Sequence, residues 1–143
     1  MNIEIGKGLL NIKFGMKEDE IIQILGNPDK IINCREDGKE YLYNRLKLKL
    51  FFSIEDDNRL YSIEVFNKSN TFLSTEVIGL TLEELLSFMA QNGYEKHDEI
   101  DEYDYFDTIH FDDCNTSFTI EFNEITSFEF SPLFKDDEII WPQ

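Results

Sequence analysis

The sequence predicts an α+β protein in which two tandem units, each a helix followed by an antiparallel β-meander, pack as one domain. Segments 17–25 and 81–93 each show apolar residues at helical spacing, and each is followed by alternating apolar and polar residues typical of half-buried strands. A chain of 143 residues also has the length of a single domain. We therefore expect one domain over 1–143, with internal repeats at approximately 12–68 and 76–132.

The chain opens with a loosely alternating stretch, 2–13, that predicts a strand or an extended lead-in. A helix is predicted over 17–25, because its isoleucines lie on one face and three acids occupy its first turn, where the helix dipole favours negative charge. Gly26 suits the left-handed position after a helix, and Pro28 prevents the helix from continuing.

A β-meander is expected next. Its clearest strand is 46–52, where leucines alternate with Lys47 and Lys49. The polar stretch 67–76 is the only plausible linker, and it is short enough that the two halves should pack together. The strands expected before this linker lie at 30–34, 41–44, 46–52 and 60–66, with turns at 36–39 and 56–58.

The second half repeats this order. Thr81 and Glu84 have the spacing of a capping box, and Gly93 ends the helix that they begin. Three strands are expected after it, at 103–111, 117–122 and 125–130. The end of the chain, 135–143, is expected to be frayed, with Trp141 docked back onto the body. The two helical segments align through Gly15 with Gly79, Lys17 with Thr81, Glu20 with Glu84, and Ile21 with Leu85.

Acidic charge is the strongest compositional signal. The chain carries 30 acidic and 13 basic residues, for a net charge of −17. Residues 95–143 hold 15 of the acids but only two bases, Lys96 and Lys135. Such a surface repels nucleic acid and anionic membranes and attracts basic partners, although acidic residues also serve solubility alone.

Few residues could carry catalysis. The only histidines are His97 and His110, and no nucleophile elbow, P-loop or dinucleotide-binding motif is present. A Cys114–His110 pair is close in sequence but lacks an obvious third group to orient it. We expect no enzyme and no cofactor. Cys34 and Cys114 are too few for a disulfide scaffold, so we expect reduced thiols.

The segment 98–107 is the best candidate for a binding site. It contains six acids and no base, interleaved with aromatic side chains. Carboxylates orient a basic partner, and tyrosines supply anchors that lose their water on binding. Alternatively, the tyrosines form a core-facing strand face and the acids lie outside. No metal site is expected, because the carboxylates lack the glycine and spacing of a calcium-binding loop. The predicted partner-binding residues are Asp98, Glu99, Asp101, Glu102, Tyr103, Asp104, Tyr105, Asp107, Asp112 and Asp113.

The segment from Phe14 to Pro28, Phe-Gly-Met-Lys-Glu-Asp-Glu-Ile-Ile-Gln-Ile-Leu-Gly-Asn-Pro, followed by a Leu/Phe-rich hairpin, resembles the SmpA/OmlA (BamE-like) α+β module. The likeness covers about 14–66 and, more weakly, 78–130. Lys17 replaces the usual capping hydroxyl, and the lipoprotein signal with its acylated cysteine is absent. A doubled, small, acidic module also resembles bacterial immunity proteins of the contact-dependent inhibition or polymorphic toxin type.

This resemblance implies a non-catalytic immunity protein that neutralises a basic, nuclease-like toxin domain, with its acidic surface occupying the groove that binds nucleic acid. The alternative is a scaffold or regulatory protein-interaction module with no toxin partner. No secretion signal or membrane span is recognisable, so a cytoplasmic protein is expected, as a monomer or weak dimer.

Overall fold

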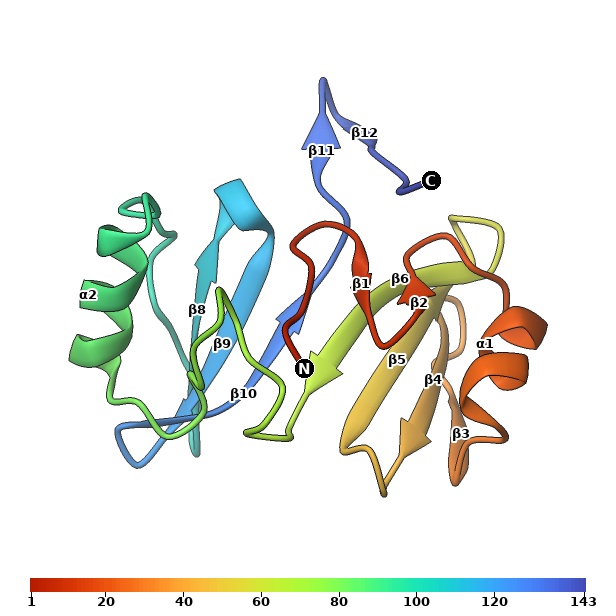
Figure 1. Ribbon diagram of the computed structural model, residues 1–143, viewed down its shortest axis with the longest axis horizontal. Helices are drawn as coiled ribbons and strands as arrows, with labels where there is room; N and C mark the ends of the chain where they lie inside the picture. Colours follow the sequence, from red (N-terminus) through yellow and green to blue (C-terminus); the bar gives the residue numbers. More distant parts are fainter.

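The computed structural model describes residues 1–143 and shows a mostly β protein, with about 40% of residues in strands and 15% in helices. Its centre is one eight-stranded antiparallel sheet in the order β3-β4-β5-β6-β10-β9-β8-β7 (Figure 1). The small hairpins β1–β2 (Gly8–Leu9 and Ile12–Lys13) and β11–β12 (Phe134–Lys135 and Glu138–Ile139) lie outside this sheet. The sheet strands are β3 (Lys30–Asn33), β4 (Gly38–Tyr43), β5 (Leu48–Ser53), β6 (Arg59–Val65), β7 (Asp101–Glu102), β8 (Asp107–Phe111), β9 (Thr116–Glu121) and β10 (Glu124–Phe130).

The predicted fold class is wrong. The chain does not form two tandem helix-plus-meander repeats, because β6 pairs directly with β10 and unites all the long strands in one sheet. In this pairing Phe128 lies opposite Val65 and Phe130 opposite Ile63. The two α-helices, α1 (Glu18–Leu25) and α2 (Leu82–Gln91), are short. Neither is long and apolar enough to cross a lipid bilayer.

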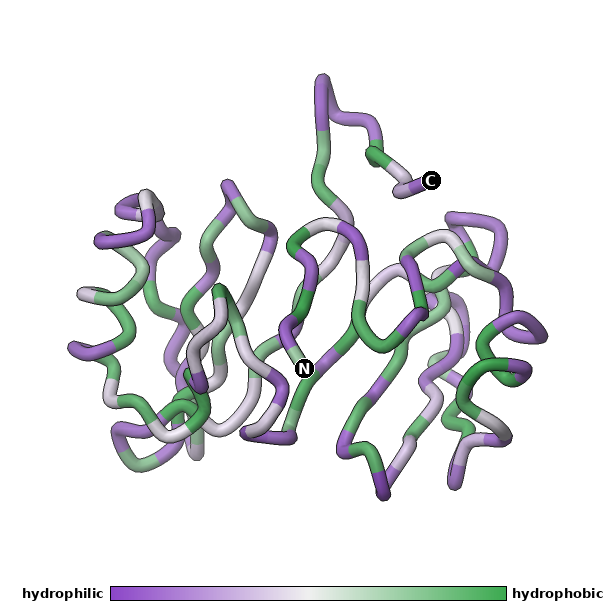
Figure 2. The backbone as a smooth tube through the Cα atoms, viewed as in Figure 1, coloured by the Kyte–Doolittle hydropathy of each residue, from purple (hydrophilic) through white to green (hydrophobic).

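Both helices pack on the same face of the sheet. Ile21 of α1 and Leu85 and Met89 of α2 are fully buried in one hydrophobic cluster with the inward residues of the long strands. Alternation along the strands places their other side chains on the opposite, polar face. Hydrophilic residues gather at the turns and at the end of the β11–β12 hairpin (Figure 2). The shared core explains why the short helices are stable: their apolar faces are covered by the sheet.

The helix signals in the sequence are confirmed. Glu84 donates its backbone N–H to Thr81 Oγ1 at 3.2 Å, and Thr81 donates its backbone N–H to Glu84 Oε1 at 3.0 Å, so the predicted capping box forms. At the start of α1, Lys17 has no oxygen with which to cap the helix. Its backbone N–H donates to Glu20 Oε1 at 3.1 Å, and its ammonium pairs with Asp57 at 2.6 Å.

Three local predictions need correction or refinement. The stretch 67–76 is no linker, because Phe72 is fully buried and makes edge contacts with Phe118 and Phe128. The strand predicted over 103–111 starts only at Asp107, since 103–106 form the turn after β7. The segment 135–143 contributes to the β11–β12 hairpin, and Trp141 packs on the body as predicted.

Candidate functional site

The predicted partner-binding residues do not form one surface, because strand β8 separates them. Its five extended residues hold its two ends about 13 Å apart. Asp98 lies beside the end of β8, where its backbone N–H donates to the His110 carbonyl at 2.9 Å. Glu99 belongs to the segment that leads into β7. Asp112 and Asp113 follow β8 directly, whereas Asp101, Glu102, Tyr103, Asp104, Tyr105 and Asp107 lie at its beginning or in the adjoining β7 hairpin.

Four aromatic side chains, Tyr103, Tyr105, Phe106 and Phe122, form an exposed cluster that we call the aromatic tip. Tyr105 is 88% exposed and Phe122 is 100% exposed. The rings of Tyr103 and Phe106 stack with their centroids 4.7 Å apart. The tyrosines are therefore surface residues, and the alternative that they form a core-facing strand face is wrong. Exposed apolar side chains that gather in this way are typical of binding surfaces.

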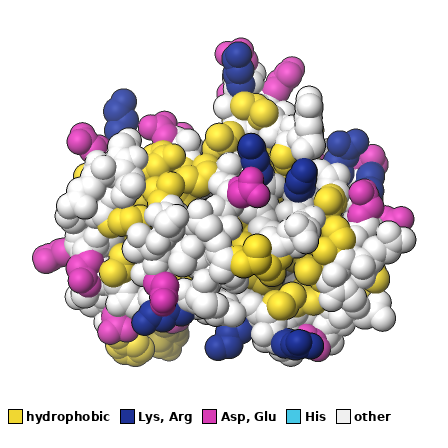
Figure 3. Space-filling view, viewed as in Figure 1, with side chains coloured by type: hydrophobic (Ala, Val, Ile, Leu, Met, Phe, Trp, Pro, Cys, Tyr) yellow, Lys and Arg dark blue, Asp and Glu magenta, His cyan; other side chains and the backbone are white.

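The aromatic tip borders a hollow of about 270 Å³ between the β7–β8 and β9–β10 turns. Asp104 and Asp107 contribute carboxylates to this hollow, and its lining contains no Lys or Arg. Figure 3 shows hydrophobic side chains at the lower left, where Figure 1 places the β9–β10 turn, bordered by charged side chains of both signs. The tip can thus accept a side chain that is partly apolar and positively charged.

Phe122 was not predicted as a site residue. It stands in the two-residue turn between β9 and β10 with φ of +50°, a region that bulky residues rarely adopt. The alternation of the sequence places Phe122 in the strand predicted over 117–122, but β9 ends at Glu121, so Phe122 lies in the turn and joins neither face of the sheet. Such strain at an exposed aromatic residue is a reason to look for function there.

A second acidic surface is a groove of about 1010 Å³, which we call the acidic groove. It is bounded by the β3–β4 turn, the β5–β6 turn and the β11–β12 hairpin, and its lining contains no Lys or Arg. The sequence does not reveal this groove, because its walls come from distant segments, 34–61 and 134–141. Its carboxylates are Glu36, Asp37, Glu40, Glu55, Asp56, Asp137 and Glu138, and its aromatic residues are Phe51, Tyr61, Phe134 and Trp141.

The acidic groove adjoins the two carboxylates that follow β8, Asp112 and Asp113. Asp112 and Asp113 line a hollow of about 530 Å³ that also includes Tyr61 and Asp137, two residues of the acidic groove. The predicted residues at the end of β8 therefore extend the groove. The aromatic tip lies at the other end of β8 and is a separate surface (Figure 1).

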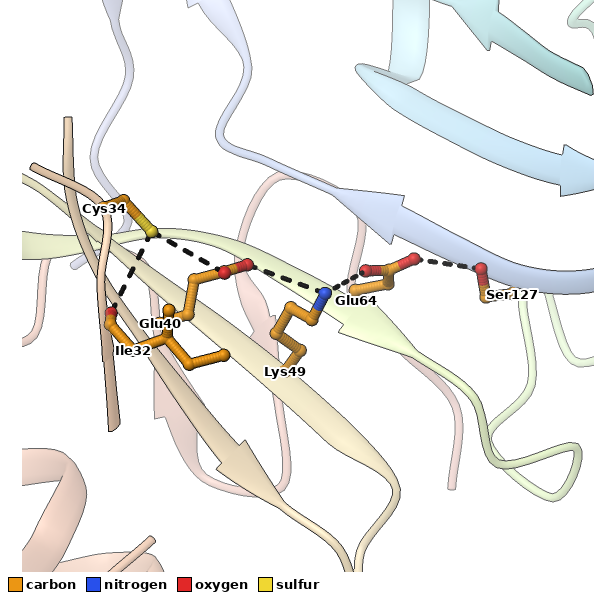
Figure 4. Close-up of polar contacts among 6 residues, drawn as sticks. All are labelled: Ile32, Cys34, Glu40, Lys49, Glu64 and Ser127. Atoms are coloured by element: carbon orange, nitrogen blue, oxygen red, sulfur yellow. Dashed lines mark hydrogen bonds and ion pairs between the residues drawn. The ribbon is translucent and has the colours of Figure 1, made fainter. Parts of the chain in front are cut away.

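The polar face of the sheet carries a row of paired side chains (Figure 4). Lys49 Nζ lies 3.6 Å from a carboxylate oxygen of Glu40 and 3.6 Å from one of Glu64. Ser127 Oγ donates to the second oxygen of Glu64 at 3.0 Å, and the Cys34 thiol donates to Glu40 at 3.6 Å. One lysine thus bridges two carboxylates across neighbouring strands β4, β5 and β6.

Glu129 of β10 lies beside this row of side chains, opposite Glu64 in the pairing of β6 with β10. Its neighbour there is another carboxylate and not a base. Glu129 is exposed, yet loss of water around its carboxylate, and then repulsion from Glu64, raise its pKa from 4.5 to about 7. Between these two values the native state holds a proton that the unfolded state has released. The free energy of unfolding is therefore highest below pH 4.5 and falls as the pH rises towards 7. Because Glu129 is exposed, water screens part of this effect.

Replacement Glu129→Gln is expected to raise the melting temperature more at pH 8 than at pH 5, because only at the higher pH does it remove a charge from the native state. Thermal denaturation at both values measures the effect. Glu121→Gln, on the neighbouring strand β9, is the matched control for removing one carboxylate, and at pH 8 Glu129→Gln should raise the melting temperature more than it does. Equal shifts for Glu129→Gln at pH 5 and pH 8 would contradict the assignment.

The thiols are not activated. Burial raises the pKa of Cys114 to about 11, and burial together with Glu40 raises the pKa of Cys34. Both thiols therefore stay protonated at neutral pH, whereas a nucleophilic cysteine needs its thiolate form. His110 and Cys114 bond to different partners. The Nδ1 of His110 lies 2.7 Å from Ser117 Oγ, and the Cys114 thiol donates to the Phe111 carbonyl.

Fold and surface together define an antiparallel-sheet protein with two short helices on one face and exposed acidic and aromatic regions. No protein-family model matches the chain, and no curated protein matches it. Two solved structures are similar. One is an extracellular protein containing an SCP domain from Bacillus anthracis str. Ames, with a TM-score of 0.54, 10% identity, and coverage of 100% of this chain and 53% of that chain.

The other is a DUF4309 family protein from Bacillus subtilis, with a TM-score of 0.52, 15% identity, and coverage of 89% of this chain and 88% of that chain. The chain spans about half the length of the Bacillus anthracis protein. At these identities the likeness shows the fold alone.

Proposed function

We propose that this chain is a non-catalytic binding protein that holds a basic partner protein through the aromatic tip. The observation that carries the proposal is the exposure of four aromatic side chains beside carboxylates, in a hollow whose lining has no base. Exposing such side chains to water is unfavourable unless a partner covers them. Binding energy in protein interfaces concentrates in tyrosines and other large side chains of this kind.

Charge supports a basic partner. The net charge of −17 attracts a cationic protein at long range, and the carboxylates of Asp104 and Asp107 would meet it at the tip. A surface of this sign disfavours nucleic acid and anionic membranes as ligands. Association with a basic partner should therefore be fast and should slow as salt screens the attraction.

The partner that we propose is a bacterial toxin domain, which makes the chain a cytoplasmic immunity protein, without a cofactor and as a monomer or weak dimer. A nuclease-type toxin must present a cationic groove to phosphates, and an acidic, aromatic surface is complementary to such a groove. A scaffold or regulatory module with no toxin partner is the alternative, and the next experiment separates the two.

Affinity capture from lysate of the source cells, with the wild-type chain and two variants as baits, tests the proposal. The variant Tyr105→Ala/Phe122→Ala should weaken retention of the captured basic protein by about 30-fold or more, because interface hot spots each exceed about 2 kcal/mol. Glu55→Gln/Asp56→Gln, in the acidic groove, is the matched control and should retain it. The captured protein is then produced in cells with and without the chain.

One basic protein held by the wild type, lost with the aromatic-tip variant, and toxic to cells only when the chain is absent would support the immunity function. A basic protein that is retained but not toxic would favour the scaffold or regulatory alternative. Equal retention by both variants, or retention of no basic protein at either low or high salt, would overturn the aromatic tip as the binding site.

A further inference from the structure

Three side chains from three segments converge at the end of β8. They are Asp98, from the segment between α2 and β7, His110 in β8, and Asp112 in the short 3-10 turn after it. One donor atom from each lies within 4.8 Å of the others. This group combines an imidazole with two carboxylates, which is a mixed ligand set and differs from the purely carboxylate surfaces elsewhere on the protein.

His110 is held in the orientation that a metal ligand needs. Its Nδ1 lies 2.7 Å from Ser117 Oγ on strand β9, outside the group. When Nδ1 donates its proton to this hydroxyl, the lone pair of Nε2 points away from Ser117 and towards Asp112. Histidine ligands in proteins are usually fixed in this way by a second hydrogen bond. The ring is also half-buried, so little rotational freedom remains to be lost.

The spacing fits a small divalent ion. Two ligands about 2.1 Å from a tetrahedral metal are about 3.4 Å apart. His110 Nε2 and Asp112 Oδ1 are 3.4 Å apart. The side chain of Asp98 is exposed, so it is free to rotate until its carboxylate reaches the ion. Its backbone N–H donates to the His110 carbonyl at 2.9 Å, which keeps the residue beside β8.

The local charge also favours a cation. The adjoining hollow of about 470 Å³ is lined by four carboxylates and one lysine, Lys96. These carboxylates belong to Glu95, Asp98, Asp112 and Asp113. Imidazole nitrogen suits zinc, cobalt and nickel better than calcium or magnesium, which prefer oxygen ligands alone.

We propose that Asp98, His110 and Asp112 bind one divalent transition-metal ion, such as Zn²⁺, with further coordination positions open to the hollow. The ion links the segment between α2 and β7 to the end of β8, because its ligands come from both. Its remaining positions take water or a side chain from outside the protein. This site does not depend on the aromatic tip, which lies at the other end of β8.

Calorimetric titration of the full chain with Zn²⁺, and absorption spectroscopy with Co²⁺, test the proposal. One ion should bind per chain, and Ca²⁺ and Mg²⁺ should bind much more weakly. His110→Ala should abolish saturable binding, and Ser117→Ala should weaken it by about 10-fold, because it removes only the group that orients the ring. His97→Ala is the matched control: His97 lines the same hollow, but its ring does not belong to the group whose donor atoms lie within 4.8 Å of one another.

His97→Ala should leave the affinity unchanged, and circular dichroism without metal should show that every variant is folded. Co²⁺ bound with an imidazole and carboxylates should give weak visible bands that disappear in His110→Ala. The proposal is overturned if Zn²⁺ does not saturate the wild type at one ion per chain. It is equally overturned if folded His110→Ala binds like the wild type, or if His97→Ala loses as much affinity as His110→Ala.

Discussion

Replacement Phe118→Ala is expected to destabilise the protein by about 3–5 kcal/mol, as is usual for truncating a fully buried aromatic residue. Phe118 lies at the centre of the core and is 0% exposed. Its ring contacts those of Phe72, Phe111 and Phe128, with centroid distances of 5.5, 5.8 and 5.9 Å. These partners come from three different parts of the chain, so the cavity left by alanine cannot be closed by moving one element.

Urea denaturation followed by circular dichroism measures this loss. The matched control is Phe122→Ala, because Phe122 lies four residues further along the same hairpin and is 100% exposed. Its replacement removes the same atoms without opening a cavity, so stability should change by no more than about 0.5 kcal/mol. Similar losses for Phe118→Ala and Phe122→Ala would contradict the burial on which this expectation rests.

Local signals in the sequence predicted local structure well. The capping box at Thr81 and Glu84 and the glycine after α1 each depend on neighbouring residues only, and both helices formed where expected. The pairing of β6 with β10 could not be predicted in this way. Alternation tells which residues of a strand face the core but does not say which other strand lies beside it, so the sequence predicts two tandem repeats packed as one domain and not a single shared sheet.

The polar stretch 67–76 shows the same limit. Its composition is typical of a linker, yet a single residue within it, Phe72, fills the space between Phe118 and Phe128. Binding residues that are close in sequence were likewise easier to predict than residues that the fold brings together. The exposed tyrosines at 103 and 105 were found because they are neighbours in sequence, whereas the acidic groove needs Asp37, Asp56 and Asp137 to be brought together by the fold.

Replacement Gly38→Ala is expected to destabilise the protein by about 3 kcal/mol or more. Gly38 begins β4 with φ of +151°, and a Cβ built there would lie 1.9 Å from the Phe52 carbonyl oxygen. The backbone of β5 would have to move away, which costs ladder hydrogen bonds in addition to the strain of a conformation that alanine rarely adopts. Thermal or urea denaturation measures the loss.

Gly93→Ala separates these two costs, because Gly93 also has positive φ, +88°, but no heavy atom lies within 4 Å of the added methyl group. That variant should lose only about 1 kcal/mol, the backbone part of the cost. Equal losses for the two variants would show that β5 gives way freely. If Gly38→Ala loses more, the turn before β4 is held rigidly against β5. Asp37, just before β4, and Ser53, at the end of β5, both line the acidic groove. A rigid contact between these strand ends therefore keeps the groove preformed.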